Sequence, residues 1–212
     1  MTENIDLKKI EKKAWTSYFQ DGLWDIFLGL ILLNFGIAPI IEDLTGTIYE
    51  ISYYAILIIA FIIFYGGKKY ITAPRLGRAK FSVERKSKRK KTIIVLTLSV
   101  LFGLIMLILT STDFLSFKNT IQFIAIIFGI NAIIVFSIMA YFLDFNRLYL
   151  YGWFFAGSII LTQLSRNYVG TIYDNVLGFV IFGGIMILIG IIYFIRFLQK
   201  YPLTHEEILN GN

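Results

Sequence analysis

The chain has 212 residues, of which 57% are hydrophobic and 16% are charged, and its mean hydropathy is +0.72. A soluble domain is normally about a quarter charged, so this composition indicates a membrane protein. The sequence has no cysteine and one histidine, His205, which excludes disulfides and thiolate sites and argues against haem or zinc held by histidines. We expect no metal, no cofactor and no catalytic residues, and hence no enzymatic activity.

Six apolar stretches are each long enough to cross a bilayer. A helix rises about 1.5 Å per residue, so about 20 apolar residues cover a hydrocarbon core of about 30 Å. In lipid such stretches form helices, because their backbone groups must pair within the segment. The expected fold is all-α, a polytopic six-span bundle within residues 21–198. The expected spans are residues 22–41, 49–67, 92–112, 120–143, 147–165 and 176–198.

Residues 1–20 are expected to precede the bundle as an amphipathic helix at the cytoplasmic interface. Within residues 3–19, an apolar stripe that includes Ala14, Trp15 and Tyr18 recurs at helical spacing, and lysines occupy the remaining arc. This pattern is typical of a helix lying on the cytoplasmic leaflet. A short helix packed beneath the bundle is an equally good interpretation, and both make the segment an anchor.

The first expected span carries a regular row of glycines: Gly22, Gly29 and Gly36 repeat every seven residues. Small residues let helices approach closely in lipid, so this row predicts a helix-packing face. The later spans carry comparable rows, with Gly129 and Ala132 in the fourth, Gly152 and Ala156 in the fifth, and Gly183 and Gly190 in the sixth. A compact bundle follows, and a homodimer through one of these faces is an open alternative.

Two acidic residues, Asp21 and Asp25, mark the start of the first span. Asp21 is a predicted N-cap, and Asp25 lies one turn further along, near the positive end of the helix dipole. Carboxylates four residues apart share a face, as a proton or cation relay requires, but we favour capping and hydration at the interface. Two local ion pairs are expected elsewhere: Asp144 with Arg147, and Arg166 with Asp174.

Polar side chains inside the spans are the default site candidates, because each costs free energy unless it is paired. Asn34 and Asn131 lie nearest the span midpoints, whereas Asp25 and Gln163 lie nearer the ends. One interpretation has these four residues form an intramembrane polar site. The other has each amide bonded to a neighbouring helix, worth about 0.6–2 kcal/mol. We favour the second, because no carboxylate or lysine lies at mid-membrane.

The predicted loop over residues 68–91 has the most individual sequence. Its eleven basic residues and its single acid, Glu84, give it a net charge of +10, and such a cluster attracts anionic lipid at about 1 kcal/mol per basic residue. Anionic headgroups or a cytoplasmic protein partner are the expected ligands, because a Pro-Arg-Leu-Gly turn can present arginines to phosphate or carboxylate. The predicted contact residues are Arg75, Arg78, Lys80 and Arg85. Nucleic acid is not expected, because no RNA-binding fold accompanies the charge.

The charge distribution predicts the orientation. Of the 20 Lys and Arg residues, only Lys118 and Arg166 fall on the side opposite the predicted loop. By the positive-inside rule, both termini, including the tail over residues 199–212, face the cytoplasm of a multi-pass protein in the cell membrane. Tyrosines near the span ends, among them Tyr151 and Tyr193, are expected to anchor the helices at the interface.

Three functions are compatible with these features. The favoured one is a non-enzymatic bundle that binds anionic lipid or a cytoplasmic partner through residues 68–91. The alternative is a transporter or permease subunit, because the amphipathic helix, six spans and long second connection resemble the layout of ABC-2-type permease subunits. In that family the interfacial helix and that loop contact a separate ATPase, although residues 166–175 are shorter than the external element expected there. A lipid-modifying enzyme relying on Asp21, Asp25, Asp144 or a tyrosine is the least favoured.

Overall fold

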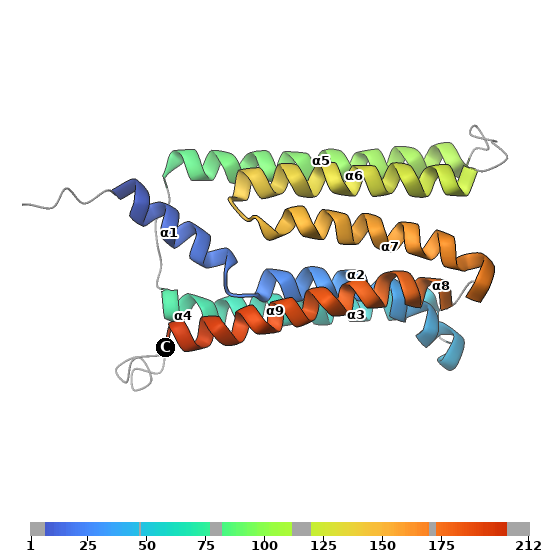
Figure 1. Cartoon of the computed structure of the whole chain (residues 1–212), viewed down its shortest axis with the longest axis horizontal. Coiled ribbons are helices and arrows are strands. Elements are labelled where there is room, and N and C mark those ends of the chain that lie inside the picture. Colours follow the sequence, from blue (N-terminus) through green and yellow to red (C-terminus); the bar gives the residue numbers. More distant parts are fainter. Residues whose placement is uncertain (1–6, 47, 77–81, 112–119, 170–172, 203–212) are drawn as a thin grey trace, which may run out of the picture.

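The computed structural model describes residues 7–46, 48–76, 82–111, 120–169 and 173–202, and over these residues it contains helices and no strand (Figure 1). The long helices are α2 (Leu23–Thr45), α3 (Tyr49–Gly66), α5 (Val83–Ser111), α6 (Thr120–Leu143), α7 (Arg147–Val169) and α9 (Ile181–Lys200). The shorter elements are α1 (Leu7–Phe19), α4 (Ala73–Leu76), α8 (Tyr173–Asn175) and two π-helices, η1 (Gly67–Thr72) and η2 (Val176–Val180).

The predicted all-α fold is therefore confirmed, and the apolar bundle is consistent with an integral membrane protein. Within the described ranges, five segments are long and apolar enough to cross a membrane: Ala14–Thr45, Ile51–Leu76, Val83–Thr110, Phe123–Leu143 and Tyr173–Lys200. The 23 residues of α7 give it the necessary length, but it is less apolar than these five. The exact count of six spans stays a prediction.

Large apolar side chains cover much of the outside of the bundle. Ile62 on α3 is 65% exposed and Leu107 on α5 is 61% exposed, and many of their neighbours resemble them. Apolar surface this continuous is unfavourable in water but suits hydrocarbon. The bundle thus presents lipid-compatible faces on α3 and α5.

Glycines set the closest helix crossing, between α2 and α9. A Cβ atom added to Gly29 would lie 2.8 Å from Cγ1 of Ile187, and one added to Gly183 would lie 2.8 Å from the backbone nitrogen of Leu33. Gly190 is equally close to Ile26 of α2. The predicted glycine faces of the first and last spans therefore pack against each other within one chain.

The helices form two groups joined along α7. In one group α2 packs between α3 and α9, and in the other α6 packs between α5 and α7 (Figure 1). Gly129 meets Ala156, and a Cβ on Gly152 would lie 3.0 Å from that of Phe136, so the small residues predicted in the fourth and fifth spans bring α6 and α7 together. The element η2 joins the groups by packing against both α7 and α2.

Helix α1 runs obliquely across one end of the bundle, next to the starts of α2 and α5 (Figure 1). Its Trp15 Nε1 donates to the Leu143 carbonyl at 2.7 Å, and Phe19 stacks on Phe145 at 5.5 Å. Glu11 accepts the Ser82 backbone N–H at 2.8 Å, a bond that lowers the pKa of the Glu11 carboxyl. Helix α1 therefore packs against the bundle, whereas its contact with a membrane surface stays a prediction.

The segment over residues 68–91 differs from the expected loop, because most of it is helical. It continues α3 as η1 and α4, and its most charged part forms the first turns of α5. Lys, Arg and Glu are good helix formers, so the helix extends beyond its apolar stretch. We call the end of the bundle where α1, η1, the start of α5, the α6–α7 connection and the end of α9 meet "the basic end".

Candidate functional site

Asp21 forms the first of two buried ion pairs at the basic end. Its side chain is 0% exposed, and its carboxylate accepts hydrogen bonds from Lys68 Nζ at 2.7 Å, Thr72 Oγ1 at 2.6 Å and the Leu23 backbone N–H at 3.2 Å. Lys68 also donates to the Tyr18 carbonyl at 2.6 Å, with its ammonium 3.8 Å from the Tyr18 ring centroid. The N-cap residue of α2 is Gly22 and not the predicted Asp21. Asp21 lies one residue earlier, and its hydrogen bonds tie the start of α2 to η1.

Asp25 forms the second buried pair, with Arg147 at the start of α7. Arg147 binds both carboxylate oxygens, from Nε at 2.9 Å and Nη2 at 2.7 Å, and the Tyr151 hydroxyl donates to the same carboxylate. Nη2 also donates to the Phe19 carbonyl at 2.8 Å, and the guanidinium carbon lies 3.8 Å from the Tyr193 ring centroid. A single arginine therefore joins α1, α2, α7 and α9.

Three expectations at this end are corrected. Asp25 is 0% exposed, so it is not hydrated at the interface. Asp144 does not pair with Arg147; it pairs with Arg85 of α5, because Arg147 is held by the buried Asp25. Tyr151 is also fully buried and hydrogen-bonded rather than an interfacial anchor. The predicted pair of Arg166 and Asp174, in contrast, is confirmed, with a separation of 3.5 Å.

Of the four predicted anion-contact residues, the structure describes Arg75 and Arg85. Arg75 donates from Nη1 to its own helix, at the Ile71 carbonyl, and Arg85 is paired with Asp144. Arg78 and Lys80 lie outside the described residues. The described part of the predicted loop therefore leaves neither arginine free of a protein partner.

The four intramembrane candidates are also separated. Asn34 donates to the Tyr53 carbonyl of α3 at 3.0 Å, and Asn131 donates to the Ser99 hydroxyl of α5 at 2.9 Å. Asp25 lies at the basic end, as described above. Asn131 and Gln163 both line one largely apolar groove between α5, α6 and α7. Each asparagine amide thus bonds to a neighbouring helix.

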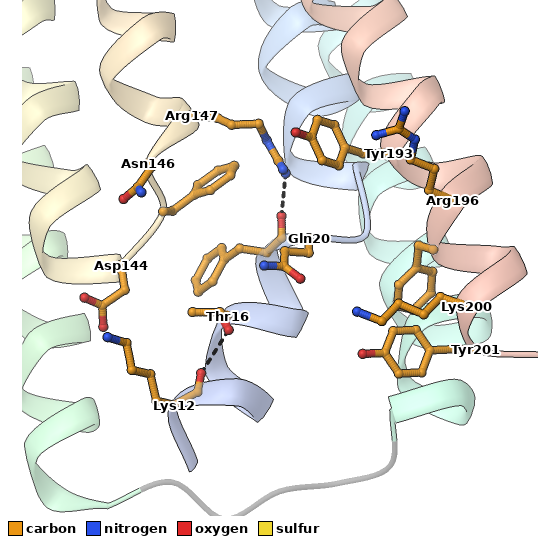
Figure 2. A pocket seen from close by; sticks show the side chains of 13 residues that line it. Lys12, Thr16, Gln20, Asp144, Asn146, Arg147, Tyr193, Arg196, Lys200 and Tyr201 are labelled. Carbon is orange, nitrogen blue, oxygen red and sulfur yellow. Dashed lines mark hydrogen bonds between the residues drawn. The ribbon is translucent and has the colours of Figure 1, made fainter. Parts of the chain in front are cut away.

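A different cavity, of about 590 Å³, opens at the basic end between α1, the α6–α7 connection and the end of α9 (Figure 2). We call it the basic pocket. Figure 2 shows Arg147 and Tyr193 together on one side, Lys200 at the end of α9 with Tyr201 next to it, and the Lys12 side chain reaching from α1 toward Asp144. The lining residues are Lys12, Thr16, Phe19, Gln20, Asp144, Phe145, Asn146, Arg147, Tyr193, Arg196, Phe197, Lys200 and Tyr201.

The charges in the basic pocket do not cancel. Asp144 is paired with Arg85, and Arg147 is paired with Asp25. No ion pair joins Lys12, Arg196 or Lys200 to a carboxylate of the described residues, although the Lys12 side chain points toward Asp144 (Figure 2). Over the described part of the chain the pocket is therefore lined by three cations without an ion pair, and hydroxyl and amide donors lie beside them.

Sequence reasoning missed most of this pocket, although a signal was present. Arg196, Phe197 and Lys200 lie three, four and seven residues after Tyr193, which places all four on one face of α9. From the sequence alone, Tyr193 is expected as an interfacial anchor, and Arg196 and Lys200 count only toward the predicted orientation. The sequence does not show where α1 packs, and α1 forms the wall of the basic pocket opposite α9.

No protein-family model, curated protein or solved structure matches the chain. The function is therefore argued from the geometry and chemistry of the site.

Proposed function

We propose that this protein is a non-enzymatic integral membrane protein that binds the phosphate of an anionic lipid headgroup in the basic pocket. The observation that carries the proposal is the trio of Lys12, Arg196 and Lys200, which form no ion pair with any described residue and line a cavity of about 590 Å³. Ligand pockets in proteins are commonly about 300–1,000 Å³, so the cavity has room for a headgroup.

The position of the pocket along the helices supports a lipid rather than a soluble anion. Arg147 begins α7 and Lys200 ends α9, so the pocket lies where membrane helices reach the interface. Apolar rings of Phe19, Phe145 and Phe197 line the same cavity as the cations. A lipid presents a charged phosphate next to apolar chains, and this pairing matches the lining. If the positive-inside rule orients the chain, the bound lipid belongs to the cytoplasmic leaflet.

The expected preference for anionic lipid follows from the number of free cations. Each basic residue near a membrane surface contributes about 1 kcal/mol toward anionic lipid. Three such residues give about 3 kcal/mol, or a preference of about 100-fold over a zwitterionic lipid with the same chains. Arg147 adds less, because Asp25 already balances its charge.

Native mass spectrometry of the purified protein with phosphatidylglycerol and with chain-matched phosphatidylcholine tests the proposal. The test variant combines Lys12→Ala, Arg196→Ala and Lys200→Ala. The matched control combines Lys86→Ala, Arg89→Ala and Lys90→Ala. It also removes two lysines and one arginine, but from exposed positions on α5. We expect the test variant to lose one tightly bound phosphatidylglycerol per chain and the control to keep it. Equal losses in both variants, or equal binding of the two lipids by the native protein, would refute the proposal.

The transporter alternative has less geometric support. Asn34 and Asn131 bond to different helices, so they do not form the shared polar site that this function would use. The cytoplasmic-partner alternative uses Arg75, Arg78, Lys80 and Arg85, and the two of these that the structure describes, Arg75 and Arg85, are held by contacts within the chain. We therefore favour lipid binding over both.

A further inference from the structure

We propose a second lipid site, a groove inside the bundle that holds one acyl chain of a membrane phospholipid, with the chain's ester group at Gln163. The groove is a cavity of about 640 Å³ lined by α5, α6 and α7, together with Phe35 of α2 and Phe179 of η2. It shares no residue with the basic pocket, so this inference does not depend on the proposed function.

The walls of the groove are suited to hydrocarbon and not to water. Two pairs of phenylalanine rings border it: Phe35 with Phe179 at 5.6 Å between centroids, and Phe136 with Phe155 at 4.8 Å. A buried water needs two to four polar partners, which rings do not supply. Because α5 and α6, which line the groove, are apolar enough to cross a membrane, the molecule available to fill the space is lipid.

The shape of the groove matches a chain. Along α6 its lining extends from Ile124 to Phe136, a rise of about 18 Å at about 1.5 Å per residue. Gln163 lies sixteen residues after Arg147 in α7, about 24 Å from the basic end. The groove therefore extends toward the leaflet opposite the basic pocket.

Gln163 identifies where the polar part of the lipid lies. Its amide lines the groove and has no hydrogen-bond partner among the described residues, whereas Asn131 is bonded to Ser99. The Gln163 side chain is half-buried, and its amide is not one of the buried unpaired atoms. Where hydrocarbon surrounds it, an amide without a hydrogen-bond partner costs about 1–3 kcal/mol. An ester carbonyl at the head of an acyl chain accepts from this NH2 group and removes the cost. Gln163 is six residues from the end of α7, about 9 Å, a depth that an ester group near the interface reaches.

Lipid retention after detergent purification tests this site. The protein is reconstituted with phosphatidylcholine, a zwitterionic lipid that the free cations of the basic pocket do not prefer, and retained lipids are counted by native mass spectrometry. Ala132→Phe fills the groove, and Ile134→Phe adds the same ring on the same helix at a position that is 52% exposed. We expect Ala132→Phe to retain one phosphatidylcholine fewer per chain and Ile134→Phe to retain the native number. Gln163→Leu is expected to weaken retention without abolishing it.

A measurement on the unaltered chain keeps the proposal testable if Ala132→Phe disturbs the packing of α6 and α7. Phosphatidylcholine carrying a photoreactive group at the end of one acyl chain should cross-link near Phe136. The same group next to the ester should cross-link near Gln163. Equal retention in the two phenylalanine variants, cross-links spread evenly over the exposed helices, or a quinone recovered in place of phospholipid would each overturn the inference. None of these results bears on phosphatidylglycerol in the basic pocket.

Discussion

The pair between Asp25 and Arg147 should dominate the polar contribution to the stability of the bundle. Asp25 is 0% exposed, Arg147 is 17% exposed, and the two share a bidentate contact. Removing one partner of a buried pair costs about 3–5 kcal/mol, because an uncompensated charge stays behind. Three variants measure this: Arg147→Met, Asp25→Asn and the two combined.

The two single variants should lose different amounts of unfolding free energy. Arg147→Met leaves the Asp25 carboxylate with the Tyr151 hydroxyl and no cation, so we expect a loss at the upper end, about 5 kcal/mol. Asp25→Asn leaves Arg147 its bond to the Phe19 carbonyl and its contact with the Tyr193 ring. A cation–π contact is worth about 0.5–2 kcal/mol, so the expected loss is about 3 kcal/mol.

The double variant decides whether the pair acts as a unit. It removes both charges and leaves the Tyr151 hydroxyl and the Phe19 carbonyl without their present partners. An unsatisfied buried group costs about 1–3 kcal/mol, so the double variant should lose about 4 kcal/mol. The single losses together are about 8 kcal/mol, which predicts a coupling free energy of about 4 kcal/mol.

Reversible unfolding in mixed detergent micelles, followed by tryptophan fluorescence, gives these free energies. Trp15 and Trp24 report on the basic end, because each packs against Phe19. A matched cycle with Arg85→Met and Asp144→Asn tests the more exposed pair, whose side chains are 13% and 29% exposed, and its coupling should stay below about 1 kcal/mol. The reasoning is refuted if the double variant loses the sum of the two single losses in unfolding free energy, within about 0.5 kcal/mol.

Two further predictions use matched neighbours in the same way. Gly183→Leu should destabilise the bundle by about 1–3 kcal/mol, because its side chain would meet the α2 backbone at Leu33, whereas Gly184→Leu enters open space and should change the free energy of unfolding little. Trp15→Phe removes the hydrogen bond to the Leu143 carbonyl and should cost about 1–3 kcal/mol, whereas Trp153→Phe, at a side chain that is 64% exposed, should be near neutral. Chemical denaturation of each pair in the same micelles checks both, and equal losses within either pair would contradict the prediction.

The helices could be predicted from the sequence because a bilayer leaves few options. An apolar stretch of sufficient length must satisfy its backbone internally, so α2, α6 and α9 fall close to their expected ranges. The glycine spacing also predicted a packing face correctly, because seven-residue repeats stay on one side of a helix. Residues 68–91 were less predictable, because charge was interpreted as loop, although charged residues continue a helix well once it has started.

The ion pairs could not be predicted, because partners are chosen by which helix ends meet. Arg147 has Asp144 three residues before it in the sequence, yet it binds Asp25, which is 122 residues away. Local spacing favours the near pair, but burial decides in favour of the far one. Asp144 is 29% exposed and is paired with Arg85, so it does not need Arg147. Asp25 is fully buried, and no water can take the place of Arg147 there.

The same arginine explains why binding and stability should respond to different residues at the basic end. Arg147 lines the basic pocket, but its charge is committed to Asp25. A ligand phosphate that drew Arg147 away would leave a buried carboxylate uncompensated, at the cost worked out above. Lys12, Arg196 and Lys200 form no ion pair with the described residues, so they can bind a ligand phosphate without leaving a buried carboxylate unpaired. Substituting these three cations should therefore change lipid affinity at nearly constant stability, whereas substituting Arg147 should change stability first.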